Sequence, residues 1–218
     1  MKKFLVAAVC AFSAMAVSAQ SFFSTEKSED GIVFGVRAGL VGAGASIKGG
    51  NESLSLDSRM GFNAGVNVDI PLMQSLHVQT GLFFQQKGAK WEEEGYTEKY
   101  NPTYLQLPVL ASYRYAFSDA CELQVNVGPY FALGLGGKAK MEEEGDELVE
   151  GDFFGGENDE ESMRMKKFDM GLQFGAGVTV AKHYYLGFSY DLGLTNIARG
   201  EKETWKNRAW MINLGYNF

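Results

Sequence analysis

The sequence predicts an all-β fold, namely an eight-stranded antiparallel up-and-down β-barrel that spans a membrane. Eight segments alternate between apolar and polar or small side chains with a period of two, which is the strand pattern. The chain ends on such a segment, in which Trp210, Ile212, Leu214, Tyr216 and Phe218 share one face. Short and long connections alternate along the chain, which indicates a meander with two different ends.

Each predicted strand is justified by the apolar face that its alternate residues form. In chain order the faces run from Phe34 to Leu40 in 33–41, Phe62 to Ile70 in 61–70, Leu76 to Phe84 in 76–87, Leu105 to Tyr115 in 104–117, Leu123 to Leu135 in 122–136, Met170 to Val178 in 168–180, Tyr184 to Leu192 in 184–194 and Trp210 to Phe218 in 210–218. The opposite faces are rich in Gly, Gln and Asn, which suits a crowded polar lumen.

The connections between these strands fall into two groups. Three are tight turns, at 71–75, 118–121 and 181–183. Four are long, at 42–60, 88–103, 137–167 and 195–207. Outer-membrane barrels have short periplasmic turns and long surface loops, so we expect the long connections at the cell surface. An even number of strands places both termini on the same side.

The N-terminus has the pattern of an export signal. Lys2 and Lys3 precede an apolar stretch from Phe4 to Val17, and Ala19 ends a small-residue cleavage site. We expect residues 1–19 to be a signal peptide, 20–30 an N-terminal periplasmic segment and 31–218 the outer-membrane β-barrel domain. Lipoprotein processing at Cys10 is disfavoured because the apolar run continues past it. Removal of the signal leaves Cys121 alone, which excludes an internal disulfide.

The charge balance excludes some partners. The chain has 20 Lys and Arg against 27 Asp and Glu, a formal charge of −7, which becomes about −9 once Lys2 and Lys3 are removed. An acidic exported chain is a poor candidate for binding nucleic acid. The expected partner is outer-membrane lipid, with a possible extracellular or envelope protein partner.

A soluble, lipocalin-like carrier of a hydrophobic ligand is the alternative fold, because period two does not say which face is inside. The polar face and the four long loops at one end argue against it. Aromatic residues near predicted strand ends suit the two membrane interfaces instead; they are Tyr113, Tyr115, Tyr184, Tyr185, Trp205 and Trp210.

The most conspicuous local feature is the acidic segment 142–161. It carries eleven acidic residues and no Lys or Arg. We expect a solvated, partly disordered surface loop, because like charges repel one another and few apolar residues are present. A weak divalent-cation site or a patch for a basic partner is the alternative, although the spacing of an EF-hand loop is lacking.

Charged residues on the predicted lumen face indicate a filled interior. Arg37 and Arg114 stand against Asp69, Asp169 and Asp191, and buried charges persist when they are paired. An eight-stranded barrel has an interior that side chains just fill, so we expect no open pore. Separately, Pro108 and Pro129 lack ladder donors and lie nearly opposite each other in the predicted hairpin. They predict a bulge or a weakened seam.

Nothing in the sequence identifies catalytic chemistry. His77 and His183 both lie beside predicted short turns, away from the surface loops. The Gly-rich stretch 42–46 lacks the Lys of a phosphate-binding loop, so it is expected to be loop or strand end. We therefore assign no catalytic, cofactor-binding or metal-binding residue, and we expect that the protein is not an enzyme and has no cofactor.

Four stretches resemble the PorT-like outer-membrane β-barrel family of Bacteroidetes-type Gram-negative bacteria, and GVRAGL at 35–40 extends the match. They are YLQLPVLASYRY at 104–115, VNVGPYFALG at 125–134, FDMGLQFGAGV at 168–178 and YDLGLTNIARG at 190–200. The resemblance implies an eight-stranded barrel in the cell outer membrane and mostly no assigned activity. One member assists protein secretion, so an accessory role in secretion is an alternative. The expected function is structural or surface binding.

Overall fold

A computed structural model describes residues 31–49, 52–93, 96–118, 120–143, 146–154, 165–199 and 203–218. The predicted signal peptide 1–19 and N-terminal segment 20–30 lie outside the described residues and stay predictions. The strands are β1 (Val33–Gly49), β2 (Glu52–Ser55), β3 (Asp57–Pro71), β4 (Leu76–Gln86), β5 (Gly88–Glu93), β6 (Tyr96–Tyr100), β7 (Thr103–Ser118), β8 (Cys121–Gly136), β9 (Lys138–Glu143), β10 (Asp146–Asp152), β11 (Phe168–Val180), β12 (Tyr184–Gly193) and β13 (Glu203–Asn217).

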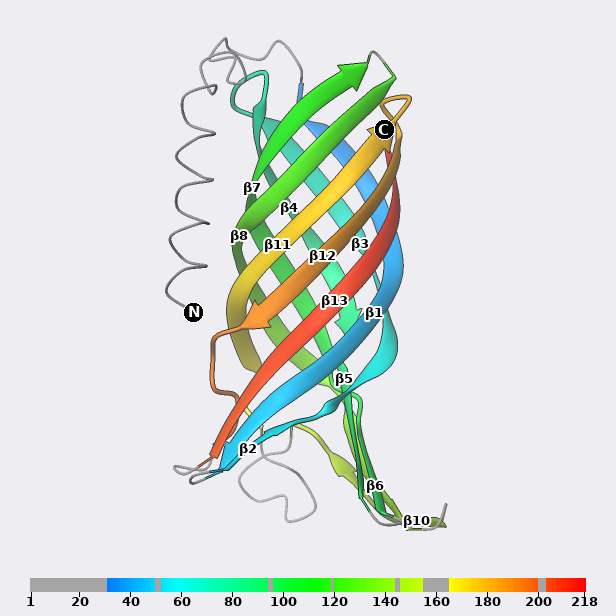
Figure 1. Cartoon of the computed structure of the whole chain (residues 1–218), viewed down its shortest axis with the longest axis vertical. Coiled ribbons are helices and arrows are strands. Elements are labelled where there is room, and N and C mark those ends of the chain that lie inside the picture. Colours follow the sequence, from blue (N-terminus) through cyan, green and yellow to red (C-terminus); the bar gives the residue numbers. More distant parts are fainter. Residues whose placement is uncertain are drawn as a thin grey trace, which may run out of the picture.

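Eight of these strands close into an antiparallel barrel (Figure 1). Neighbouring strands follow the order β1, β3, β4, β7, β8, β11, β12 and β13, and β13 pairs with β1 again. Val36 of β1 lies opposite Val66 of β3 on one side and Tyr216 of β13 on the other. The predicted fold class is therefore confirmed. Closure leaves none of the eight strands as a free sheet edge, which a bilayer requires.

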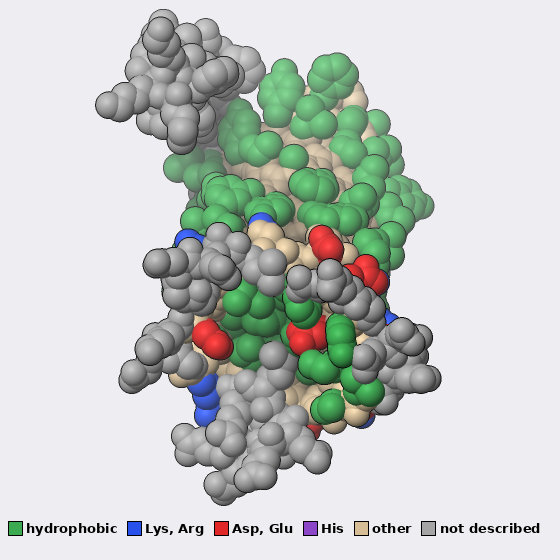
Figure 2. Space-filling model, turned by 60° about the horizontal axis from the view of Figure 1, so that its bottom comes forward, with side chains coloured by type: hydrophobic (Ala, Val, Ile, Leu, Met, Phe, Trp, Pro, Cys, Tyr) green, Lys and Arg blue, Asp and Glu red, His purple; other side chains and the backbone are tan. Residues whose placement is uncertain are grey.

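The barrel wall has its apolar face outside and its polar face inside. Leu214 is 65% exposed and Phe34 is 56% exposed, whereas the exposed fractions of Gln85 and Asn67 are only 1% each. Figure 2 shows the apolar side chains covering the wall, with charged side chains concentrated nearer one end. The soluble-carrier alternative is wrong, because its apolar face would line a cavity. Within the described ranges no helix has the length and apolar character needed to cross a bilayer.

The two ends of the barrel differ, as predicted. One end, called here the short-turn end, carries the connections 72–75 and 181–183 and the C-terminus (Figure 1). At this end Tyr184 and Phe218 both pack edge-on against Tyr216, with ring centroids 5.6 Å apart in each pair. The opposite end, the long-loop end, carries the four long connections.

Much of the predicted long loops is strand, which corrects the sequence interpretation. β1 continues to Gly49 because its second half pairs with β13 as far as Glu203, so the Gly-rich stretch 42–46 is strand. The pairs β5–β6 and β9–β10 are hairpins within the predicted loops 88–103 and 137–167. These segments have no continuous row of alternate apolar residues, because they do not face lipid. The sequence pattern that identifies the wall strands is therefore missing from them.

Four of the additional strands form a sheet that projects beyond the barrel at the long-loop end. We call β5, β6, β9 and β10 the tongue. Its strand order is β10-β9-β6-β5, and β5 continues onto β3 of the barrel wall. Figure 1 shows it extending away from the barrel body. The tongue places charged side chains well outside the apolar wall.

Three local expectations need correction or refinement. Tyr185 and Trp205, expected at the membrane interfaces, are 6% and 4% exposed and lie inside. Pro108 faces Tyr130 with no register shift at that point, so the predicted bulge is wrong. The β7–β8 pairs are nevertheless interrupted between Pro108 and Ala111, and the β4–β7 pairs are interrupted beside Pro108. The weakened seam is thus present without a bulge.

Candidate functional site

An apolar cluster fills the barrel mouth at the long-loop end. We call this the mouth plug; its fully or nearly buried members include Tyr100, Tyr104, Phe153, Phe154, Met165, Ile197, Ala198 and Trp205. The Phe153 and Phe154 rings meet edge to face at 4.9 Å, a favourable aromatic geometry. Gly134 makes room for this arrangement, since a Cβ there would lie 2.5 Å from the Phe154 ring. Residues just after the tongue therefore fold back into the barrel.

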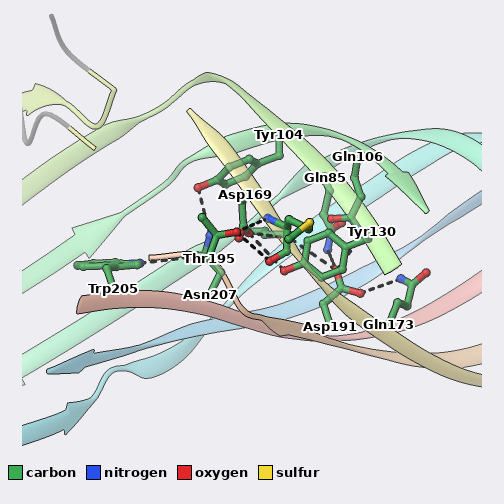
Figure 3. A network of polar contacts seen from close by, with 12 residues as sticks. Gln85, Tyr104, Gln106, Tyr130, Asp169, Gln173, Asp191, Thr195, Trp205 and Asn207 are labelled. Carbon is green, nitrogen blue, oxygen red and sulfur yellow. Dashed lines mark hydrogen bonds and ion pairs between the residues drawn. The ribbon is translucent and has the colours of Figure 1, made fainter. Parts of the chain in front are cut away.

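A polar layer lies beneath the plug and centres on Asp191 (Figure 3). Gln173 donates to Asp191 Oδ1 at 2.8 Å, and Gln106 and Gln85 donate to Oδ2 at 2.9 and 3.4 Å. The Lys87 ammonium lies 3.5 Å from the same carboxylate. All of these side chains are buried, so their mutual hydrogen bonds replace those with water.

Asp169 forms the second half of this layer. Its Oδ2 accepts from Asn207 at 3.0 Å and from the Tyr130 hydroxyl at 3.3 Å, and Lys87 Nζ is 3.7 Å away. Lys87 also lies over the Tyr130 ring, 4.4 Å from its centroid, where the ring face attracts a cation. One ammonium thus bridges two carboxylates that would otherwise repel each other.

A second charged layer lies nearer the short-turn end. Arg114 Nη2 is 2.6 Å from Asp69 Oδ1, which confirms one predicted lumen ion pair. Arg37 instead donates to Gln79 Oε1 at 3.2 Å and stacks over the Tyr185 ring at 3.8 Å. Its guanidinium is therefore held by an amide and a ring face.

The sequence interpretation found five of the interior charges but missed Lys87. Its partner set, Asp169 and Asp191, was instead grouped with the two arginines. The sequence did contain a signal. Lys87 is an even number of residues from Gln79 and Gln85 of β4, so the strand alternation places it on the same inward face. Lys87 thus joins Arg37 and Arg114 as a third cation among the described interior side chains. Asp69, Asp169 and Asp191 are the buried carboxylates there, and the partly exposed Glu122 also pairs with Arg114.

Two cavities lie inside the barrel, next to the charged layers. A small one of about 50 Å³ lies between the layers, with Arg37, Gln106 and Gln173 in its lining. A larger one of about 520 Å³ lies at the short-turn end, with Arg114, Cys121, Glu122, Lys182 and Asn217 in its lining. The interior is thus polar. Its larger cavity is at the short-turn end, and the aromatic rings of the mouth plug cover the other end.

The histidines lie where the sequence placed them. His77 is 7% exposed and lines the larger cavity, and His183 stacks on Tyr216 with ring centroids 5.3 Å apart. Both are at the short-turn end. In the described part of the chain, no group of three or more His, Cys, Asp or Glu side chains is placed to hold a metal ion.

The acidic segment 142–161 is not a solvated loop throughout, contrary to expectation. Glu142 and Glu143 belong to β9, residues 146–152 form β10, and Phe153 and Phe154 are in the mouth plug. Residues 155–164 lie outside the described residues, so the cation-site alternative is untested there. The counter-ions lie outside 142–161, on β6 and β9, so a charge count confined to that segment overlooks them.

Lysines of the tongue pair with three of its carboxylates, those of Glu92, Glu142 and Glu150. Lys99 Nζ is 2.5 Å from Glu142 Oε2, and Lys140 Nζ is 2.6 Å from Glu150 Oε2. Lys138 pairs with the other oxygen of Glu150, and Lys90 pairs with Glu92. The hydrogen bond from Lys99 lowers the pKa of Glu142 below its ordinary value of 4.5, with smaller contributions from nearby lysine charges.

The lowered pKa of Glu142 predicts a pH-dependent tongue. Its ion pair stabilises the β6–β9 pairing above the ordinary pKa of 4.5 and is lost as pH falls through the lower, folded-state pKa. Hydrogen exchange of β6 and β9, corrected for intrinsic rates, should therefore be slower in the wild type than in Glu142→Gln at pH 7. This gap should close once the pH falls below the folded-state pKa of Glu142, where the wild-type carboxyl is also neutral. A gap that persists in acid contradicts the role of the pair.

Solved structures of other outer-membrane proteins are similar to this chain at low sequence identity. Among solved structures, the chain is similar to Ail, the attachment invasion locus protein of Yersinia pestis, in complex with the heparin analogue sucrose octasulfate: the identity is 17% and the TM-score 0.42, over 87% of this chain and 100% of that one. It is also similar to the outer membrane protein OprG from Pseudomonas aeruginosa, with 14% identity and a TM-score of 0.46, over 90% of this chain and 99% of that one. For Neisserial surface protein A the identity is 14% and the TM-score is 0.41, over 86% of this chain and 98% of that one.

No curated protein sequence matches this chain. A family model does, however, and it covers most of the barrel strands described above. The model describes an outer membrane protein beta-barrel domain and matches residues 19–199 of the 218. The chain therefore belongs to the family of the outer membrane protein beta-barrel domain, and it lies in the outer membrane.

Proposed function

We propose that this protein is a closed surface barrel that binds a partner through its tongue and neither conducts solutes nor catalyses a reaction. The observation that carries the proposal is the contrast between the two parts of the molecule. The barrel interior holds two layers of hydrogen-bonded, charged side chains and is covered by the mouth plug, whereas the tongue exposes charged and apolar side chains beyond the wall.

The orientation of the barrel supports a role at the cell surface. Outer-membrane barrels place short turns in the periplasm and long connections outside. By this rule the tongue and the mouth plug face the exterior, and the cavity of about 520 Å³ faces the periplasm. The absence of histidine from the long-loop end in the described residues supports a binding role over a catalytic one. The PorT-like resemblance and its accessory role in secretion stay predictions.

Single-channel recording tests the closed interior. The wild-type protein, reconstituted in a planar bilayer in concentrated KCl, should show no discrete conductance steps, because plug and polar layers block the lumen. The triple variant Phe153→Ala, Phe154→Ala, Tyr104→Ala removes three buried rings from the mouth but leaves both polar layers in place, so it should also show no discrete steps. The heat-modifiable shift of the same samples on gels shows that the barrel is folded. Steady openings of the wild-type protein would show that the barrel is a pore.

A further inference from the structure

The outer strand of the tongue has a free edge. In the described residues β10 pairs with β9 alone and ends the sheet order β10-β9-β6-β5. The register of β9 and β10 shifts between Glu147 and Val149, which leaves the run from Val149 to Asp152 regularly paired. An unpaired strand edge presents backbone N–H and C=O groups that another extended chain can pair with.

The two faces of the tongue differ in chemistry. Cross-strand pairing sets Lys99, Lys140 and Glu150 in one row, on the face that carries the ion pairs. The next row, displaced by one residue, holds Met141 and Val149 on the opposite face. Val149 is 56% exposed and Met141 is 36% exposed, although the tongue lies beyond the membrane-facing wall. The second face is therefore uncovered and largely apolar, with Glu98 next to Met141 in the same row.

A hollow of about 200 Å³ lies on this apolar face and reaches the free edge. Its lining includes Tyr100 and Ala139 at the base and Val149 and Gly151 of the edge strand. Glu98 also lines it, and this carboxylate accepts a hydrogen bond from the Tyr100 hydroxyl. An apolar side chain from a chain added to β10 would lie next to the hollow.

The charge of β10 decides between possible occupants. Its sequence, DELVEGD, has four carboxylates and no cation. Two copies paired edge to edge in antiparallel fashion would oppose two β10 strands that carry no cation of their own, and like charges placed opposite destabilise a sheet. Lys138 and Lys140 engage Glu150, while Asp152 is exposed on the same charged face. The free edge thus favours a basic strand over a second copy of this chain.

We propose that β10 is a docking strand for an extended segment of another protein, in which basic residues alternate with apolar ones. The backbone of that segment adds a strand to the tongue. Its apolar side chains fall on the face of Val149 and the hollow, and its basic side chains fall beside Asp152. This inference deepens the proposed function by naming the partner class and the strand that binds it.

Binding of a synthetic peptide tests the inference on the full-length protein in lipid nanodiscs. The probe is a nine-residue peptide of alternating lysine and valine, and the comparison peptide replaces each lysine by glutamate. Asp152→Lys reverses one charge beside the free edge and should weaken binding of the lysine peptide at least tenfold. Glu92→Lys makes the same charge change on β5, three strands from the edge, and should alter the affinity less than twofold.

Hydrogen exchange with the bound peptide supplies a second measurement. Added protection should be confined to β10 and β9 and should be lost when the peptide contains a central proline. Equal effects of Asp152→Lys and Glu92→Lys, or equal binding of the glutamate peptide, would overturn the proposal, since a general charge effect or adhesion to the apolar face would then explain binding. Channel recordings are independent of both readouts, so failure here leaves the closed-barrel part of the proposed function standing.

Discussion

Asp191→Ala is expected to lower the free energy of unfolding by about 3 to 5 kcal/mol, the cost of breaking a buried ion pair by removing one partner. Asp191 is fully buried and accepts hydrogen bonds from Gln85, Gln106 and Gln173. After the substitution these three amides lose their shared acceptor. Lys87 is left with Asp169 alone, 3.7 Å away.

Urea unfolding in lipid vesicles, followed by the heat-modifiable shift on gels, measures this loss. Asp152→Ala is the matched control, because it removes an exposed carboxylate of the tongue and should change stability by less than about 0.5 kcal/mol. Equal losses for the two variants would mean that water already solvates the interior carboxylate, and the polar layer would then contribute little to stability.

Phe174→Arg is expected to destabilise the barrel by about 2 to 4 kcal/mol, because it places a cation on the lipid face near the bilayer midplane. Phe174 is at the centre of β11 and is 43% exposed. Val149→Arg on the tongue is the control. Val149 is even more exposed, at 56%, but its surroundings are aqueous in the proposed orientation.

The same unfolding measurement separates the two sites. A large loss for Phe174→Arg beside a loss of less than about 0.5 kcal/mol for Val149→Arg places Phe174 in hydrocarbon and Val149 in water. If both variants are tolerated equally, the wall at Phe174 does not meet hydrocarbon. Gln173→Lys, one residue away on the lumen face, should instead respond to the nearby Asp191.

The alternation of side chains was enough to predict the eight wall strands. A strand turns successive side chains to opposite faces, so the lipid-facing residues of each wall strand can be recognised from that segment alone. The predicted and observed ranges of the sixth strand are both 168–180. The alternation of short and long connections likewise predicted the two different ends, because loop length can be read directly from the chain.

Only the tertiary structure decided how the interior and the tongue are assembled. Gln85 and Asp191 are 106 residues apart in sequence, and Lys87 meets its two carboxylates only when the barrel closes. Phe153 and Phe154 lie in an acidic stretch, yet both are buried in the mouth plug. Phe153 packs against Tyr100 and Trp205, and Phe154 packs against Tyr104. The counter-ions of Glu142 and Glu150 come partly from other strands. Such contacts depend on which distant segments become neighbours, whereas a periodic pattern records only which face a residue occupies.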